Sequence, residues 1–359
     1  MRRGLIARSP VELPDAVFDA RLLRVRAAML AAQLDALVIY TNNTRPAGVS
    51  WLAGFVPYWS EAVLVVPRER GPYLVAALSF RVKSWIERVS RLAEVLHTPR
   101  IGLKAAQQIA AARADAAVGV VDFDGLPAGI AEDLREGGPA LTFHDASTLF
   151  VALRSKADPA EITLAAKAAA IAHRSLATAQ GENLNAKNLN AKNLNAMIAA
   201  VEQEARRLGA EEIYVAAAPD LDRDGRFRRI EGEAALGKAF ALRATVAYKG
   251  TWIRLVRSVC DAVIAQQAAA RFAQAVALLP SAGGFSGFRS WLVEGCRMAQ
   301  PLDPLMGSRL DEGNAPQPGA LVSVQAALEI DGRTVLLGAP ALIGAHGEAA
   351  SLLVDPLYD

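Results

Sequence analysis

Short, almost wholly apolar runs alternate with amphipathic segments through roughly the first 150 residues. A run of about four to eight apolar residues bounded by turn residues predicts a buried strand, whereas apolar residues three and four apart predict a helix. Strands are therefore expected at 35–40, 62–67, 72–77 and 117–121, and helices near 15–35, 79–93 and 104–114. Alternating strands and helices indicate an α/β domain, which we expect over residues 1–152.

The second half opens with a helix-start signal. Asp158 precedes Pro159, and Glu161 stands three residues after Asp158, so the two acidic residues are expected to form a capping box. This helix should continue to about residue 180. Further helices are expected at 195–208 and 262–279, and strands at 213–218, 241–248, 252–259, 321–328 and 333–343. The order predicts a second domain, 153–359, built of helices packed on a sheet.

A short repeat interrupts this second domain. Asn-Leu-Asn-Ala-Lys occupies 183–187 and 188–192 and nearly recurs at 193–197. Because an α-helix turns about 100° per residue, leucines five residues apart would not share one helix face. We interpret 183–197 as a tandem duplication that forms a solvated insertion.

Composition excludes several classes of protein. The chain has 39 basic and 37 acidic residues, a net charge of +2, whereas a nucleic-acid-binding protein usually carries a clear basic excess. Its two cysteines, Cys260 and Cys296, are too few for a disulfide scaffold or a zinc cage. No signal peptide and no run of about 20 uncharged apolar residues is present. We therefore expect a cytoplasmic protein that binds neither nucleic acid nor membranes.

Four stretches carry a family pattern. They are 51–55 (Trp-Leu-Ala-Gly-Phe), 153–162, 237–259 and 318–325. Their order and spacing resemble the creatinase, prolidase and aminopeptidase P superfamily of peptidase M24-like proteins, over about residues 15–355. The resemblance implies a creatinase-type α/β N-terminal domain followed by an α+β pita-bread C-terminal domain.

The same resemblance implies an assembly. Enzymes of this family usually form dimers in which the N-terminal domain of one subunit lines the site of the other. For this chain it implies a homodimer in which Tyr58, Trp59 and Glu61, just past the 51–55 motif, approach the partner's cleft.

The metal ligands of the family are missing. Its metallopeptidases bind two divalent ions with two Asp, one His and two Glu, which offset the charge of the ions. The resemblance places those five positions on Arg243, Arg254, Pro304, Gln325 and the neighbourhood of Gly338. A guanidinium stays protonated near neutral pH and cannot coordinate a cation. We therefore expect no metal and no other cofactor.

Creatinase, which hydrolyses a C–N bond without metal, offers a second comparison. It uses a histidine as acid and base, assisted by carboxylates and arginines. No histidine follows 216–219 here, and the carboxylate position of creatinase is Val256. The four histidines of the chain, at 97, 144, 173 and 346, are interpreted as surface or structural residues.

Two functions remain. The first is a non-catalytic pseudoenzyme that binds a small anionic molecule or a partner, such as an intact paralogue, in the cleft that holds the active site in the enzymes of the family. The second is a metal-independent, creatinase-like hydrolase or lyase acting on a C–N bond of a small carboxylate-bearing compound. In either case Arg243 and Arg254 should lie on neighbouring strands and either pair with Asp311 and Glu312 or hold an anion.

Overall fold

The computed structural model describes residues 9–45, 47–55, 60–179, 194–232, 234–279, 285–295, 316–345 and 348–355. The chain divides into two compact units, Met1–Arg154 and Ser155–Asp359, each described by itself below. This division falls two residues beyond the expected boundary between 152 and 153. None of the helices in the described ranges combines the length and apolar character that a membrane crossing requires.

Unit 1 is built on a six-stranded sheet with the order β4-β3-β2-β1-β5-β6. Strand β2 runs antiparallel to both of its neighbours, and the other pairs are parallel. The strands are β1 (Ala36–Asn42), β2 (Glu61–Pro67), β3 (Tyr73–Ala76), β4 (Glu94–His97), β5 (Ala117–Val121) and β6 (Thr142–Asp145). The helices are α1 (Asp15–Ala31), α2 (Ala47–Ala53), α3 (Lys83–Val89), α4 (Ile101–Ala112), α5 (Ala128–Gly137) and α6 (Ser147–Arg154), with a 3-10 turn at Phe80–Val82.

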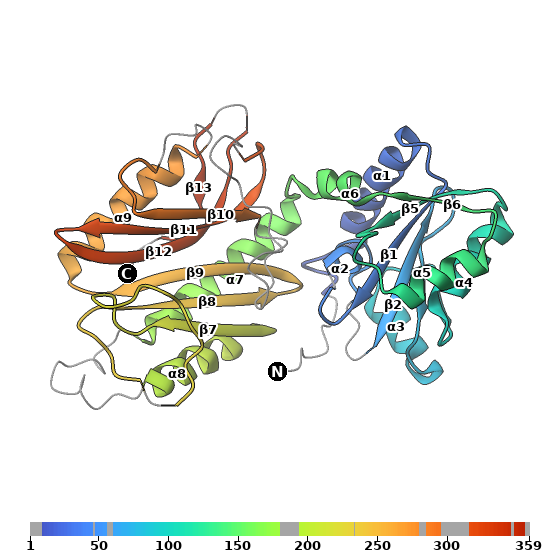
Figure 1. The fold of residues 1–359 in the computed structure, drawn as a ribbon. Coiled ribbons are helices and arrows are strands. Elements are labelled where there is room, and N and C mark those ends of the chain that lie inside the picture. The colour runs from blue at the N-terminus through green and yellow to red at the C-terminus, as the bar shows by residue number, and fades with distance from the viewer. Residues whose placement is uncertain are drawn as a thin grey trace. The chain divides into compact units, whose positions relative to one another are not determined.

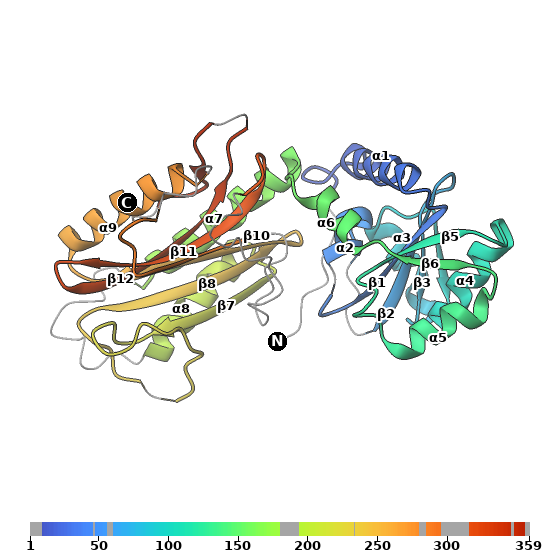
Figure 2. The same ribbon diagram turned by 45° about the horizontal axis from the view of Figure 1, so that its top comes forward.

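Both faces of this sheet are covered, which is why its strands are apolar throughout. Along β1, Leu37 and Ile39 enter a core shared with α1, α2, α3 and α6, whereas Ala36 and Val38 enter a second core shared with α4 and α5. Figure 2 shows α4 and α5 on the opposite side of the sheet from α1 and α6. The predicted α/β architecture of the N-terminal half is confirmed.

One predicted helix of unit 1 is wrong in its length. The segment 79–93 forms only the 3-10 turn and α3, and the chain then enters β4. The cause is a tertiary contact, because β4 pairs in parallel with β3 from Glu94 opposite Tyr73 to His97 opposite Ala76. Helical spacing in the sequence does not reveal this edge pairing.

Unit 2 contains a sheet with the order β10-β11-β12-β9-β8-β7, and β13 pairs with β12. Its neighbouring strands are antiparallel. The strands are β7 (Glu212–Ala218), β8 (Phe240–Tyr248), β9 (Thr251–Val259), β10 (Ser290–Gly295), β11 (Leu321–Ile330), β12 (Arg333–Leu342) and β13 (Ser351–Leu352). All the predicted strands of this half are present, but β10 and β13 were not predicted.

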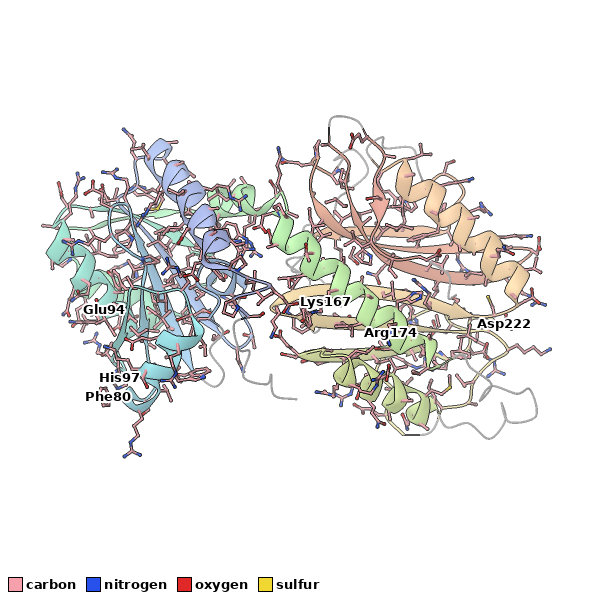
Figure 3. The ribbon with its side chains drawn as sticks, turned by 180° about the vertical axis from the view of Figure 1, so that it is seen from behind. Phe80, Glu94, His97, Lys167, Arg174 and Asp222 are labelled. Atoms are coloured by element: carbon pink, nitrogen blue, oxygen red, sulfur yellow. The ribbon has the colours of Figure 1, made fainter. Side chains whose placement is uncertain are left out.

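The six main strands form two matching halves. Helices α7 (Pro159–Ala177) and α8 (Leu194–Arg207) precede β7, β8 and β9, and α9 (Ala262–Ala277) precedes β10, β11 and β12. The halves meet where Val256 of β9 lies opposite Gly338 of β12. The three helices lie together over one face of the sheet, seen from behind in Figure 3, while the segment 219–239 lies over the other face, seen in front in Figure 1.

Local chemistry fixes two boundaries in unit 2. The Asp158 side chain accepts from the Glu161 backbone N–H at 2.9 Å, and the Glu161 side chain accepts from the Asp158 backbone N–H at 3.1 Å. The predicted capping box is therefore confirmed. Strands β8 and β9 are joined through Lys249 and Gly250, whose φ angles of 47° and 76° both lie in the left-handed region. A two-residue turn of this kind matches the twist of the hairpin strands.

The repeat is not a solvated insertion throughout. Residues 183–193 lie outside the described residues. Leu194, in the third copy, begins α8 and is fully buried, and Met197 is buried beside it. At least this end of the 183–197 segment therefore belongs to the packed domain.

Candidate functional site

The candidate site lies on the sheet face of unit 2 that the segment 219–239 covers, which we call the loop face. A buried cluster identifies this face, because its members come from strands and from that segment and none comes from a helix. They are Ala218, Leu221, Ala239, Ala241, Val256, Ala327 and Leu336, with Phe227 and Cys260 packed against them.

Strand alternation places both arginines on the loop face. Arg243 lies two residues from Ala241 on β8 and opposite Val256, and Arg254 lies two residues from Val256 on β9 and opposite Thr245. Since side chains at i and i+2 share a face of a strand, the two guanidiniums extend from the same face of neighbouring antiparallel strands. The predicted arrangement of this strand pair, with a Tyr248–Gly250 turn between the arginines, is confirmed.

Arg254 forms a buried ion pair with Glu294. The Nη1 atom of Arg254 lies 2.7 Å from Oε2 of Glu294, and the two side chains are 3% and 2% exposed. Gln325 donates from Nε2 to the same carboxylate oxygen at 3.3 Å, and Arg254 donates from Nε to Oγ1 of Thr245 at 3.3 Å. We call these four residues the Arg254 cluster. Two donors of this cluster, from Arg254 and Gln325, thus bind one oxygen of the Glu294 carboxylate.

Arg243 has no comparable partner among the described residues. Its guanidinium carbon lies 4.9 Å from the centre of the Phe227 ring, and neither an ion pair nor a hydrogen bond of this guanidinium is found in the described part of the chain. Burial and the neighbouring Arg254 lower the pKa of Arg243 to about 10, although Glu294 offsets part of that effect. The Arg243 side chain therefore stays charged at neutral pH. Two guanidinium charges then lie near a single carboxylate, Glu294, which pairs with Arg254.

The structure brings together three of the site residues predicted from the sequence. Arg243, Arg254 and Gln325 extend from the loop face, and Gly338 lies directly opposite Gln325 in the strand register. Glu61, by contrast, belongs to β2 in unit 1, where its carboxylate accepts from the Tyr40 hydroxyl at 2.7 Å. The other predicted positions lie outside the described residues; they are Tyr58, Trp59, Pro304, Asp311 and Glu312.

Glu294 is the functional residue that sequence reasoning missed. It belongs to β10, a strand of Ser290–Gly295 that was not predicted, and it lies opposite Ser323 in the pairing with β11. The sequence signal was weak, because Trp291, Leu292 and Val293 form an apolar run of only three residues. Without this strand, no pattern in the sequence placed a carboxylate beside Arg254.

The residues of the loop face do not fit a pair of divalent ions. Within the described ranges no group of three or more His, Cys, Asp or Glu side chains is arranged to hold a metal ion. None of the described histidines extends from the loop face, since His97 and His144 belong to unit 1 and His173 to α7. The side chains that extend from this face at Arg243, Arg254 and Gln325 carry guanidinium and primary amide groups, whereas divalent ions need anionic ligands.

The comparisons with known proteins agree with this architecture. Residues 21–156 match the Creatinase/Prolidase N-terminal domain family. Among solved structures, the prolidase from Pyrococcus horikoshii OT3 is 15% identical, with coverage of 95% of this chain and 99% of that chain and a TM-score of 0.69. The Xaa-Pro dipeptidase from Bacillus anthracis gives the same identity, coverage and TM-score.

A third similar solved structure is a domain from a subunit of a protein complex. The N-terminal domain of FACT complex subunit SPT16 from Cicer arietinum is 13% identical, with coverage of 94% of this chain and 96% of that chain and a TM-score of 0.62. No curated protein sequence matches the chain significantly. At these identities the structural matches show the fold, and they confirm a creatinase-type N-terminal α/β domain followed by a pita-bread domain.

Proposed function

We propose that the chain is a non-catalytic member of the creatinase/prolidase superfamily, because residues 21–156 match the Creatinase/Prolidase N-terminal domain family and the whole chain has the fold of prolidases. In this proposal the position of the family's dinuclear metal site has become a metal-independent anion-binding site. Its ligand is a small anionic molecule or an acidic group of a partner protein.

The observation that carries this proposal is the buried pair of Arg254 and Glu294 with Gln325 beside it. Two of its members stand at positions assigned to metal ligands. At about 4 Å and an effective dielectric constant of about 20, one guanidinium repels a monovalent cation by ~4 kcal/mol and a divalent cation by about twice as much. Glu294 offsets one of the two guanidinium charges, so a metal ion would still meet a net positive charge.

The charge balance supports an anion as the ligand. Arg243, Arg254 and Glu294 sum to +1, and the excess charge resides on Arg243, which has no carboxylate partner among the described residues. Arg243 is only partly exposed, and withdrawing a cation from water costs free energy unless it is paired or hydrogen-bonded. An added carboxylate or phosphate group would therefore find its strongest attraction at Arg243.

A binding role is also compatible with the fold. Peptidases are not the only proteins that have it, since a FACT complex subunit has it as well. The metal-independent hydrolase receives less support, because none of the described histidines extends from the loop face and Glu294 pairs with Arg254 at 2.7 Å. A general base must be free to accept a proton from its substrate or from water.

Activity assays separate these functions. Purified protein should release no product from Xaa-Pro dipeptides, with or without added Mn²⁺ or Co²⁺, and none from creatine. Metal-dependent hydrolysis would contradict the proposal, because it requires ligands that the loop face lacks. Hydrolysis that persists in a chelator and is lost in Glu294→Gln would establish the metal-independent enzyme instead.

A further inference from the structure

The surroundings of Arg243 are apolar and aromatic. On the neighbouring strands its direct partners are Ala216 of β7 and Val256 of β9. The Phe227 ring lies against the guanidinium, and a contact with an aromatic ring uses none of the five guanidinium N–H donors. The Arg243 guanidinium thus has N–H donors available for a ligand, and the side chains of Ala216, Val256 and Phe227 beside it contain no hydrogen-bond acceptor.

A second aromatic surface begins beside Ala216. Tyr214, two residues away on the same face of β7, stacks on Trp252 of β9 with ring centres 6.1 Å apart and an interplanar angle of 28°. Tyr214, Ala216 and Phe227 are each partly exposed, whereas Arg254 and Glu294 are buried. Near Arg243, the partly exposed residues named here therefore offer mainly apolar surface, and the Tyr214 hydroxyl donates to the Glu212 carboxylate at 2.6 Å.

The number of charges restricts the ligand further. The Arg254 cluster already contains a carboxylate, and Glu294 acts electrostatically on Arg243. A single negative charge neutralises the excess of +1, whereas a doubly charged group would leave an uncompensated negative charge beside Glu294. A monoanion is therefore favoured over phosphate.

Resting on the proposed function, we infer that Arg243 binds the carboxylate of a small monocarboxylate whose aromatic body packs between Phe227 and Tyr214. The planar guanidinium suits a bidentate contact with a carboxylate. The aromatic body replaces water on surface that is otherwise partly exposed.

Calorimetry on the full-length protein at neutral pH tests this inference with four probes. Phenylacetate should bind at least about tenfold more tightly than acetate, because burial of the ring adds to the charged contact. Phenylacetamide, which has the same shape without the charge, should bind at least about tenfold more weakly than phenylacetate. Inorganic phosphate should bind no better than acetate.

Two variants locate the site. Arg243→Gln should lose at least about tenfold in phenylacetate affinity without a fall in thermal stability. Arg226→Gln is the matched control, because Arg226 belongs to the same loop segment as Phe227, is 89% exposed and pairs with Asp224; its affinity should equal that of the wild type.

The results that overturn the inference are distinct from those that overturn the proposed function. Preference for phosphate, equal binding of the amide, or unchanged affinity in Arg243→Gln would refute the aromatic monocarboxylate. If phosphate binds and Arg243→Gln abolishes it, the anion site stands and only the ligand class is wrong. Binding of none of the four probes refutes the inference, whereas stoichiometric metal binding refutes the proposed function itself.

Discussion

Replacing Arg243 by Met should stabilise the protein, although it removes a charged side chain from the centre of the candidate site. Burial and the neighbouring Arg254 lower the pKa of Arg243 from its ordinary value to about 10, and each pKa unit corresponds to about 1.4 kcal/mol. The folded state therefore disfavours the charged side chain by about 3 kcal/mol. Loss of the contact with Phe227 removes about 1 kcal/mol. The expected net gain for Arg243→Met is about 2 kcal/mol.

The destabilisation of the folded state by the charged Arg243 side chain is fully present below about pH 10, since Arg243 is then protonated in both the folded and the unfolded state. Above about pH 10 the folded state loses this proton before the unfolded state does, so in the wild type the contribution of this group to stability rises with pH. Near pH 7 the melting temperature of Arg243→Met should be about 4–8 °C higher than that of the wild type. Differential scanning calorimetry of both proteins without added ligand measures the difference.

Arg254→Met is the matched comparison, because its arginine occupies the neighbouring strand with a carboxylate partner. Removing Arg254 leaves Glu294, which is 2% exposed, as a buried charge without its cation, and such losses cost about 3–5 kcal/mol. The two substitutions should therefore act in opposite directions. Destabilisation of Arg243→Met comparable to that of Arg254→Met would show that Arg243 has a partner of its own and would refute the reasoning.

Three further outcomes follow from other parts of the molecule. Asp158→Ala should lower the free energy of unfolding by about 1 kcal/mol in urea titrations, whereas Asp158→Ser should retain most of the cap; equal loss in both would contradict the capping role. Lys249→Asn should raise the free energy of unfolding by roughly 0.5 kcal/mol, because Asn tolerates the left-handed conformation better than Lys. A decrease would show that losing the Lys249–Glu211 contact at 3.9 Å costs more than the relief of the turn contributes. Light scattering at micromolar concentration should give the mass of a homodimer, and a monomer would contradict the proposed assembly.

Local patterns in the sequence were sufficient for much of the fold. The apolar strands of unit 1 and the capping box at Asp158 depend on neighbouring residues, and both were predictable. Strands β4 and β10 depend on pairing with residues distant in sequence, as in Glu294 opposite Ser323, and periodicity alone does not indicate such a partner.

The candidate site divides in the same way. The strand pair carrying Arg243 and Arg254 was predictable from a hairpin with a short turn between its strands. The partner of Arg254 was not, because Glu294 approaches it from the outermost strand, across β11 and β12. Charge pairing over that separation appears only once the sheet order is known.

The central claim is that guanidinium and amide groups have replaced the metal ligands of the fold. The most direct test is the metal content of the purified protein after incubation with excess Mn²⁺, Co²⁺ or Zn²⁺ and exhaustive dialysis, measured by elemental analysis. We expect no stoichiometric metal, because the family resemblance assigns Arg243, Arg254 and Gln325 to ligand positions and Glu294 pairs with Arg254. About two metal equivalents per chain, the stoichiometry of a dinuclear site, would contradict it.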